Sequence, residues 1–405
     1  MFAYLERHFD LQIGISSMLL VLIGLVSIYS ATYDARASDI FMKQLTWVGA
    51  GTMILAIAAL FPFRLLQTVS VPAYLFSLFL LVIVLLLGKT VSGSTSWFNL
   101  GSFRIQPSEF AKVTTVLALA SYLSRSDVSL RSPRGLLLAA GIVLAPIALI
   151  MLQPDFGTAV IYCGMTFAVL YWGGASRFTL LALVAPVAAA LGALLGTTAF
   201  LIVVAVFGVL IYLTKEHRLV AAVVFSLMVL VGISVQFIYD GLRPYQQKRI
   251  DTFLDPGADP LGAGYNILQS KVAIGSGGFI GKGYLHGSQT QLNFIPEQWT
   301  DFIFCVPGEE FGFAGAGVVL LLFAVFLLRG VTLASKVKSK YASFVAIGLT
   351  ATIATHVFIN IGMALGLFPV IGVPLPFLSY GGSALLSNAA MVGLLMNLYT
   401  NRKEY

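Results

Sequence analysis

The chain has 405 residues, of which 58% are hydrophobic and only 10% are charged, and its formal net charge is +7. Soluble domains carry about 25% charged residues, so this composition excludes an ordinary soluble protein and indicates an all-α polytopic membrane protein. The apolar runs are continuous rather than alternating, which excludes a transmembrane barrel. The basic residues are split among short segments, which argues against nucleic-acid binding.

Twelve apolar runs are close in length to the ~20 residues that a membrane-spanning helix needs. The first run is too long for the core of a signal peptide and is expected to be retained. The run 179–213 lacks charge and is too long for one span, so a turn at Gly196 is expected to divide it, and the region 179–237 holds an extra helix pair. We expect one integral membrane domain over residues 1–405, with spans at 11–31, 45–61, 68–88, 107–124, 136–152, 156–174, 179–195, 197–213, 219–237, 311–329, 341–363 and 384–399.

The distribution of Lys and Arg predicts the orientation. With a cytoplasmic N-terminus, the inside segments hold fourteen basic residues and the short outside loops hold four, as the positive-inside rule requires. The C-terminus is then cytoplasmic too. One large loop, 238–310, lies outside, together with the loop 89–106, the turn 153–155 and the loop 364–383. These four outer segments lie on one face and are able to build one site.

The large loop concentrates acidic residues, because 8 of the 17 in the chain lie between Asp240 and Glu310. Charge beside a membrane is costly and marks function. Asp301 is followed by Phe302, Ile303 and Phe304, and apolar surroundings favour the protonated form of a carboxyl, which suits a general base working near neutral pH. The alternative is that Asp301 simply caps the span that follows.

The span that begins at Pro107 carries two ionisable residues, Glu109 and Lys112. A spacing of three places them on one helical face, and Lys112 is deeper than a loop residue. One interpretation is that they face a cavity in the bundle. The other is an ion pair that compensates its own charge and packs helices together.

Several further motifs have structural interpretations. Asp155 is expected to cap a helix. The segment Gly275–Gly283 lacks the Ser or Thr that a phosphate-binding loop needs, so its glycines indicate tight backbone turns. The alternative is that its backbone amides approach a pyrophosphate closely. Residues 265–274 form either an interfacial helix with Tyr265, Leu268 and Val272 on its apolar face or an ordinary loop helix.

Polar residues near the C-terminus are harder to interpret. His356 and Asn360 lie one turn apart in a span and are typical of hydrogen bonds between helices. Ser379 belongs to an irregular outer loop, SYGGS. The four histidines are scattered and the two cysteines are far apart, so neither a zinc site nor a disulfide is expected.

Six stretches in order along the chain resemble the SEDS family (shape, elongation, division, sporulation), the bacterial peptidoglycan polymerases. GSQTQLNFIPEQ (287–298) is more similar to its RodA, or elongation, branch than to its FtsW, or division, branch. The six are SWFNLGSFRIQPSEFAK (96–112), LQPDFGTA (152–159), LDPGADPLGAGYNILQSKVAIGSGGFIGKG (254–283), PEQWTDFIF (296–304), GEEFGF (308–313) and GLFPVIGVPLPFLSYGGS (366–383).

The resemblance implies an inverting glycosyltransferase that polymerises lipid II into glycan strands at the outer face of the bacterial cytoplasmic membrane, for cell elongation and shape. It places the family's essential acidic residue at Asp301 and its cavity Glu and Lys at Glu109 and Lys112. It also implies a class B penicillin-binding protein as partner. The chain departs from the family in having twelve expected spans rather than the usual ten, and Trp299 where relatives carry His.

The chemistry requires a base for the acceptor hydroxyl and positive charge for the departing lipid pyrophosphate. Phosphate chemistry often recruits Mg²⁺ or Mn²⁺, but the sequence shows no ligand set, so the need for a metal stays open. The alternative function is a flippase for a lipid-linked precursor, since ionisable residues and prolines in spans suit transporters as well. Besides Asp301, the residues expected to contact substrate are Trp97, Arg104, Glu109, Lys112, Arg243, Arg249, Lys271, Glu297 and Ser379.

Overall fold

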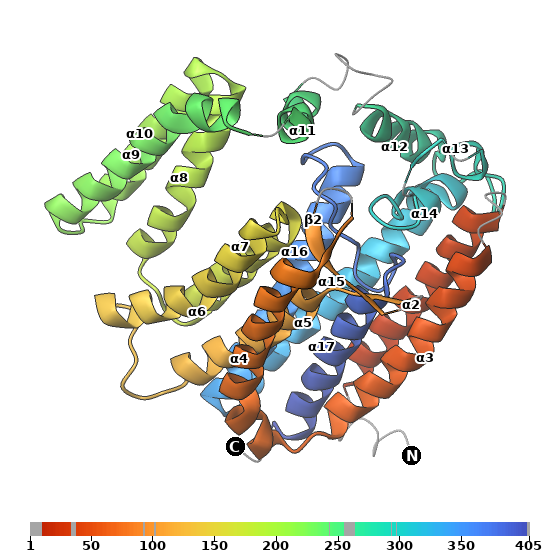
Figure 1. Cartoon of the computed structure of the whole chain (residues 1–405), viewed down its shortest axis with the longest axis horizontal. Helices are drawn as coiled ribbons and strands as arrows, with labels where there is room; N and C mark the ends of the chain where they lie inside the picture. Colours follow the sequence, from red (N-terminus) through yellow and green to blue (C-terminus); the bar gives the residue numbers. More distant parts are fainter. Residues whose placement is uncertain are drawn as a thin grey trace. The chain divides into compact units, whose positions relative to one another are not determined.

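The computed structural model describes residues 10–33, 38–91, 94–100, 103–242, 244–254, 264–292, 294–296 and 298–402 (Figure 1). The chain divides into two compact units. The first comprises Met1–Ser129, Pro133–Val169 and Tyr265–Tyr405, and the second comprises Leu130–Ser132 and Leu170–Gly264. The expectation of a single membrane domain stays a prediction.

Each of the twelve expected spans falls in a helix. In the described residues, nine helices are long and apolar enough to cross a membrane, while α7 and α9 are shorter apolar helices. The chain is therefore a multi-pass helical membrane protein. The helices of the first unit are α2 (Leu11–Tyr33), α3 (Ser38–Leu60), α4 (Phe63–Leu87), α5 (Pro107–Leu123), α6 (Pro133–Leu152), α7 (Phe156–Trp172), α12 (Tyr265–Ser276), α13 (Ser288–Gln291), α14 (Cys305–Glu310), α15 (Gly312–Lys336), α16 (Lys340–Ala364) and α17 (Gly382–Thr400).

Helices α5, α16 and α17 form the core of the first unit and contact one another (Figure 1). Of the most apolar stretch of each helix, 78% is buried in α16 and 72% in α17, against 39% or less in the other long apolar helices. Small residues allow this close packing: a Cβ added at Gly348 would lie 2.6 Å from Val116 Cγ1. The outer helices bear many exposed apolar side chains, which suits contact with lipid.

Three short antiparallel strands, β1 (Lys89–Val91), β2 (Ser94–Leu100) and β3 (Phe103–Ile105), form a sheet where only a loop was expected. Lys89 pairs with Trp97, and Asn99 pairs with Arg104. The sheet is tied to the turn before α7, because the amide of Thr95 and the hydroxyl of Ser94 both donate to the Gln153 carbonyl, at 3.2 and 2.8 Å.

The second unit contains α8 (Arg177–Leu195), α9 (Thr197–Leu213), α10 (Arg218–Asp240) and α11 (Pro244–Leu254). The expected turn at Gly196 is present: its φ of 121° is in the range that favours glycine, and it ends α8 and begins α9. Ala185, Ala189 and Met228 form the core of this unit.

Candidate functional site

The backbone around Asp301 is held by three consecutive hydrogen bonds. The Tyr380 N–H donates to the Trp299 carbonyl at 2.8 Å, and the Ser379 hydroxyl donates to the Thr300 carbonyl at 2.6 Å. The Asn360 amide donates to the carbonyl of Asp301 itself at 2.8 Å. These donors come from α16 and the loop before α17, so the fold fixes the main chain that carries the carboxylate.

The Asp301 carboxylate faces the loop that follows α16. A Cβ added at Gly372, whose φ is 71°, would lie 3.6 Å from Asp301 Oδ2. The three residues after Asp301 are buried. The cap position of α14 is Phe304 and that of α15 is Phe311, so the interpretation of Asp301 as a helix cap is wrong.

A buried cluster of ionisable groups lies at the start of α5. Lys112 Nζ is 2.9 Å from Glu109 Oε1, and the two residues are 1% and 4% exposed. Lys112 Nζ is also 2.8 Å from Nε2 of His356 on α16. The expected ion pair is present, and a helix distant in sequence supplies its third member.

The first turn of α17 holds the main chain at Arg104. The Ser383 hydroxyl donates to the Arg104 carbonyl at 3.2 Å and accepts from the Gln106 N–H at 3.0 Å. Burial raises the pKa of Tyr380, and the positive charge of Arg104 partly offsets that rise. The positive charge of the exposed Arg104 side chain therefore acts on the loop before α17. Ser379 of that loop also bonds the Thr300 carbonyl.

Asp155 caps α7, as expected: its carboxylate accepts from the amide of Thr158 at 3.0 Å and from the Thr158 hydroxyl at 2.8 Å. It also accepts from the Gln106 side chain at 2.9 Å. A Cβ at Gly157 would lie 2.7 Å from the Ile371 carbonyl. The α7 turn thus packs against both the start of α5 and the loop that faces Asp301.

Lys271 lies on α12, which is helical as expected. Its Nζ would be 2.6 Å from a Cβ added at Gly366, so the ammonium lies over that glycine at the start of the loop that faces Asp301. The buried face of α12 runs through Ile267, Ser270 and Ala273. Val272, on the face expected to be apolar, is 50% exposed, and the choice between an interfacial helix and an ordinary loop helix stays a prediction.

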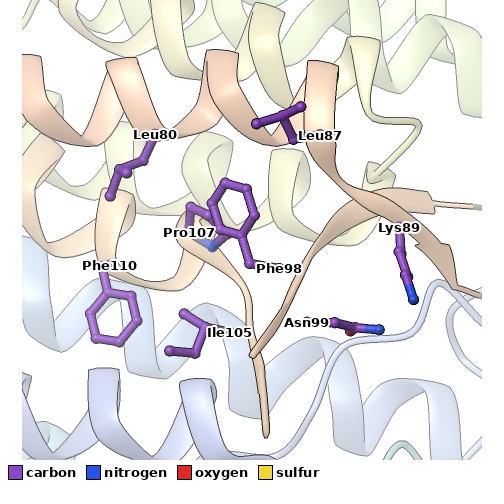
Figure 2. A pocket seen from close by; sticks show the side chains of 8 residues that line it. All are labelled: Leu80, Leu87, Lys89, Phe98, Asn99, Ile105, Pro107 and Phe110. Atoms are coloured by element: carbon purple, nitrogen blue, oxygen red, sulfur yellow. The ribbon is translucent and has the colours of Figure 1, made fainter. Parts of the chain in front are cut away.

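Three expected substrate residues are not placed. Arg243 and Glu297 lie outside the described residues, as does the side chain of Arg249 on α11. Trp97 is half-buried in β2. Next to β2 is a pocket of about 280 Å³, mostly apolar with Lys89 and Asn99 at one end, as Figure 2 shows. It is lined by Leu80, Leu87, Lys89, Phe98, Asn99, Ile105, Pro107 and Phe110.

Two adjacent glutamates of α14, Glu309 and Glu310, anchor the segment that leads from α12 to α14. Glu309 accepts from Lys282 at 2.7 Å and from the N–H groups of Gln289 and Thr290, both at 2.9 Å. Burial alone would raise the pKa of Glu309, but these donors outweigh it and the pKa lies below its usual value.

Glu310 accepts from the Ser30 hydroxyl of α2 and from Gln291 at 3.2 Å. Burial raises the pKa of Glu310 against these two donors, and the charge of Glu309 raises it further. The adjacent carboxyls thus have opposite tendencies to ionise. In the described part of the chain, no group of three or more His, Cys, Asp or Glu is placed to hold a metal ion.

The expected hydrogen bond between helices is confirmed for His356 of α16, which contacts Lys112 of α5. Asn360 instead holds the Asp301 carbonyl, a contact that the sequence did not predict. The available signal was two polar side chains one turn apart in an apolar span, since such residues normally face a bundle interior or cavity.

Comparisons with known proteins agree with this architecture. The family model of the FtsW/RodA/SpoVE cell cycle proteins matches residues 11–197 and 182–404. The chain is 35% identical to the peptidoglycan glycosyltransferase MrdB of Escherichia coli (strain K12), over 96% of this chain and 94% of MrdB. It is 33% identical to the peptidoglycan glycosyltransferase RodA of Treponema pallidum (strain Nichols), over 96% and 97%.

Solved structures give the same result. A chain from a peptidoglycan synthase complex, described as coordinating polymerization and crosslinking, matches with a TM-score of 0.75 and 28% identity, over 98% of this chain and 99% of that one. RodA of Thermus thermophilus, a rod shape determining protein, matches with a TM-score of 0.66 and 25% identity, over 98% of each chain. The chain is therefore a member of the FtsW/RodA/SpoVE family of cell cycle proteins.

Proposed function

We propose that the chain is a peptidoglycan glycosyltransferase that polymerises lipid II into glycan strands at the outer face of the bacterial cytoplasmic membrane, during cell elongation. Its relatives MrdB and RodA carry that enzyme name. The observation that carries the proposal is the fixed backbone at Asp301. The carbonyls of residues 299, 300 and 301 all accept hydrogen bonds from segments later in the chain. A base must be positioned before it can act efficiently.

The reaction joins the acceptor hydroxyl to the anomeric carbon of the donor. As the new carbon–oxygen bond forms, the bond to the lipid pyrophosphate breaks, and Asp301 takes the hydroxyl proton. Single displacement at that carbon inverts its configuration. A base held in place in this way contributes about 10²- to 10⁴-fold in rate.

The leaving pyrophosphate carries negative charge that nearby cations stabilise. Arg104 and Lys271 are exposed and so accessible to it. Lys112 is buried and already contacts Glu109 and His356, so its contribution is electrostatic rather than a direct contact on an open surface. Trp97 and Ser379 are the remaining members of the proposed substrate-binding group. Ser379 acts indirectly, because its hydroxyl holds the Thr300 carbonyl.

The proposal includes an orientation and a partner. The distribution of basic residues supports cytoplasmic termini and a position outside the cytoplasm for Asp301. The crosslinking partner is a class B penicillin-binding protein, which is supported by the match to a synthase complex that coordinates polymerization with crosslinking.

The central test replaces Asp301 with Asn. Purified full-length Asp301→Asn protein should fold normally but make at least about 100-fold less glycan from lipid II, because the amide cannot accept the proton. The readout is the amount of polymer on a gel. Asp127→Asn, the same change at an exposed turn residue after α5, should keep full activity. An Asp301→Asn protein with normal output would remove Asp301 from the mechanism.

The flippase alternative is separated in liposomes. A polymerase makes glycan from lipid II with no gradient. A flippase moves labelled precursor between leaflets and makes none. Wild-type protein that only translocates the precursor would overturn the proposed function.

A further inference from the structure

Helix α16 carries two buried polar side chains that reach both parts of the candidate site. His356 and Asn360 are four residues apart and so share one face of the helix, and they are 4% and 0% exposed. A membrane helix pays to bury such groups. Their hydrogen bonds must therefore offset the cost of burying them.

The contacts of His356 fix its protonation. Its Nδ1 lies 3.2 Å from the Pro374 carbonyl, and because a carbonyl only accepts, Nδ1 carries the hydrogen. Nε2, 2.8 Å from the Lys112 ammonium, is then an acceptor. His356 is a neutral ring that holds Lys112 on one side and the loop before α17 on the other.

The contacts of Asn360 fix the orientation of its amide. Its nitrogen lies 2.8 Å from the Asp301 carbonyl and 2.7 Å from the Val373 carbonyl. Both neighbours are acceptors, so both N–H groups of the amide are used. Asn360 therefore joins the main chain of the proposed base to the same loop that His356 holds.

The two side chains bind consecutive carbonyls, those of Val373 and Pro374. One short peptide segment is thus shared between them, with Lys112 reached through His356 and Asp301 reached through Asn360. Gly372, the residue just before, lies beside the Asp301 carboxylate. A shift at either end of this chain of contacts displaces the other.

We propose that His356 and Asn360 are a positioning pair that fixes Lys112 and Asp301 relative to each other through residues 373 and 374. The proposal rests on the proposed function for its catalytic meaning. Neither residue contacts substrate. Their role is to hold the cation and the base at the separation that the reaction needs, and misplacement by about 1 Å can cost about 100-fold in rate.

The test compares His356→Leu, His356→Gln and Asn360→Leu in the purified full chain. His356→Leu and Asn360→Leu should lower kcat for lipid II by about 10- to 100-fold per folded molecule, with KM changed by less than about twofold. His356→Gln should recover most of the loss, because its amide both donates and accepts. The double Leu variant should have a kcat only slightly below that of the less active single variant, because each single substitution already releases residues 373 and 374.

Thr352→Val is the matched control. Thr352 is buried one turn before His356 on the same helix, and its hydroxyl bonds only within α16, to Gly348 at 2.8 Å. Its removal should leave kcat unchanged. Normal kcat in both Leu variants would overturn the proposal, as would a His356→Gln variant no better than His356→Leu.

A second measurement does not depend on catalysis. The amides of Leu375 and Tyr380 donate to the Ser379 hydroxyl and the Trp299 carbonyl, so they report the order of this loop. Hydrogen exchange of peptides covering residues 371–381 should be at least about 10-fold faster in the two Leu variants, and unchanged in Thr352→Val. Unchanged exchange overturns the positioning role. A wild type that makes no glycan overturns the proposed function instead, and the exchange result still decides the role of the pair.

Discussion

Glu309 and Glu310 are adjacent in the chain, but their different surroundings shift their pKa values in opposite directions. The first is surrounded by donors, including Lys282 and two backbone N–H groups. The second has fewer donors, is buried, and lies beside the charge of the first. The pKa of Glu309 is lowered and that of Glu310 is raised, so the two carboxyls affect stability in opposite directions as pH changes.

Substitution by Gln should reveal this difference in thermal unfolding. A lowered pKa stabilises the fold above the usual carboxyl range and loses that effect as pH falls through the folded-state value. Glu309→Gln should therefore cost about 2 kcal/mol at pH 7, with the deficit shrinking below about pH 4. The measurement is Tm of the purified protein across pH, with the exposed Glu216→Gln as control.

Glu310→Gln should show the opposite trend. A raised pKa means that the ionised form costs stability, so wild type weakens as pH rises from the usual value through the folded-state one. The neutral Gln lacks that cost, and the variant should gain on wild type as pH rises to 8. A Glu310→Gln protein that loses Tm relative to wild type with rising pH would contradict this environment.

For single residues, the sequence predicts which residues matter better than it predicts which side chains they contact. Glu109 and Lys112 were found from spacing on one helix, and Asp155 from its place before a helix. The partners of Asp301 and Lys112 could not be found this way, because they come from α16 and the loop after it. Hydropathy places a residue in a helix but does not say which distant side chain it faces.

Among the elements, the glycine-rich segment after α12 packs its backbone directly on the end of α14 and the start of α15. The Phe313 N–H donates to the Gly278 carbonyl at 2.9 Å, and the Lys282 N–H donates to the Glu309 carbonyl at 3.0 Å. Gly281 has a φ of 88°, and a Cβ there would clash with the Glu310 carbonyl. The expectation of tight turns is confirmed, and close backbone contact is the reason for them.

Gly281→Ala should therefore destabilise the protein by about 2 kcal/mol or more, from the left-handed backbone and the clash together. Gly275 offers a matched control, because it lies in α12 and a Cβ there meets nothing within 4 Å. Gly275→Ala should be neutral or stabilise by up to about 1 kcal/mol. Thermal unfolding of the two variants side by side decides the point, and equal Tm values would rule out the close approach at Gly281.

The apolar spans were predictable because each is a continuous run, and all twelve fall in helices. The strands β1 to β3 were missed although Ser94–Leu100 is followed by Gly101 and Ser102, a hairpin signal. A short polar strand carries little periodicity, so its pairing depends on the neighbouring turn at Gln153. The sequence left two interpretations of α12 open, and its buried face follows from its contact with α14, which weak amphipathicity does not predict.

Across the whole molecule, the orientation proposed from Lys and Arg can be measured in cells. His286→Cys should react with a membrane-impermeant maleimide added to intact cells, and Ser126→Cys should react only after lysis. Both positions are exposed. The background needs only Cys163 replaced, because Cys305 is buried and burial raises its pKa to about 12, which leaves little thiolate. Labelling with the two sides exchanged would invalidate the assignment of Asp301 to the exterior.

The three carbonyl contacts at residues 299 to 301 have a consequence for how this region can diverge. Tyr380, Ser379 and Asn360 recognise main-chain oxygens, which every amino acid supplies. These contacts therefore do not depend on which side chains stand at positions 299 and 300. They do depend on the length of the segment, because one inserted or deleted residue would shift every contact by one position and turn the carboxylate away. The number of residues in this segment is therefore the feature that these contacts constrain.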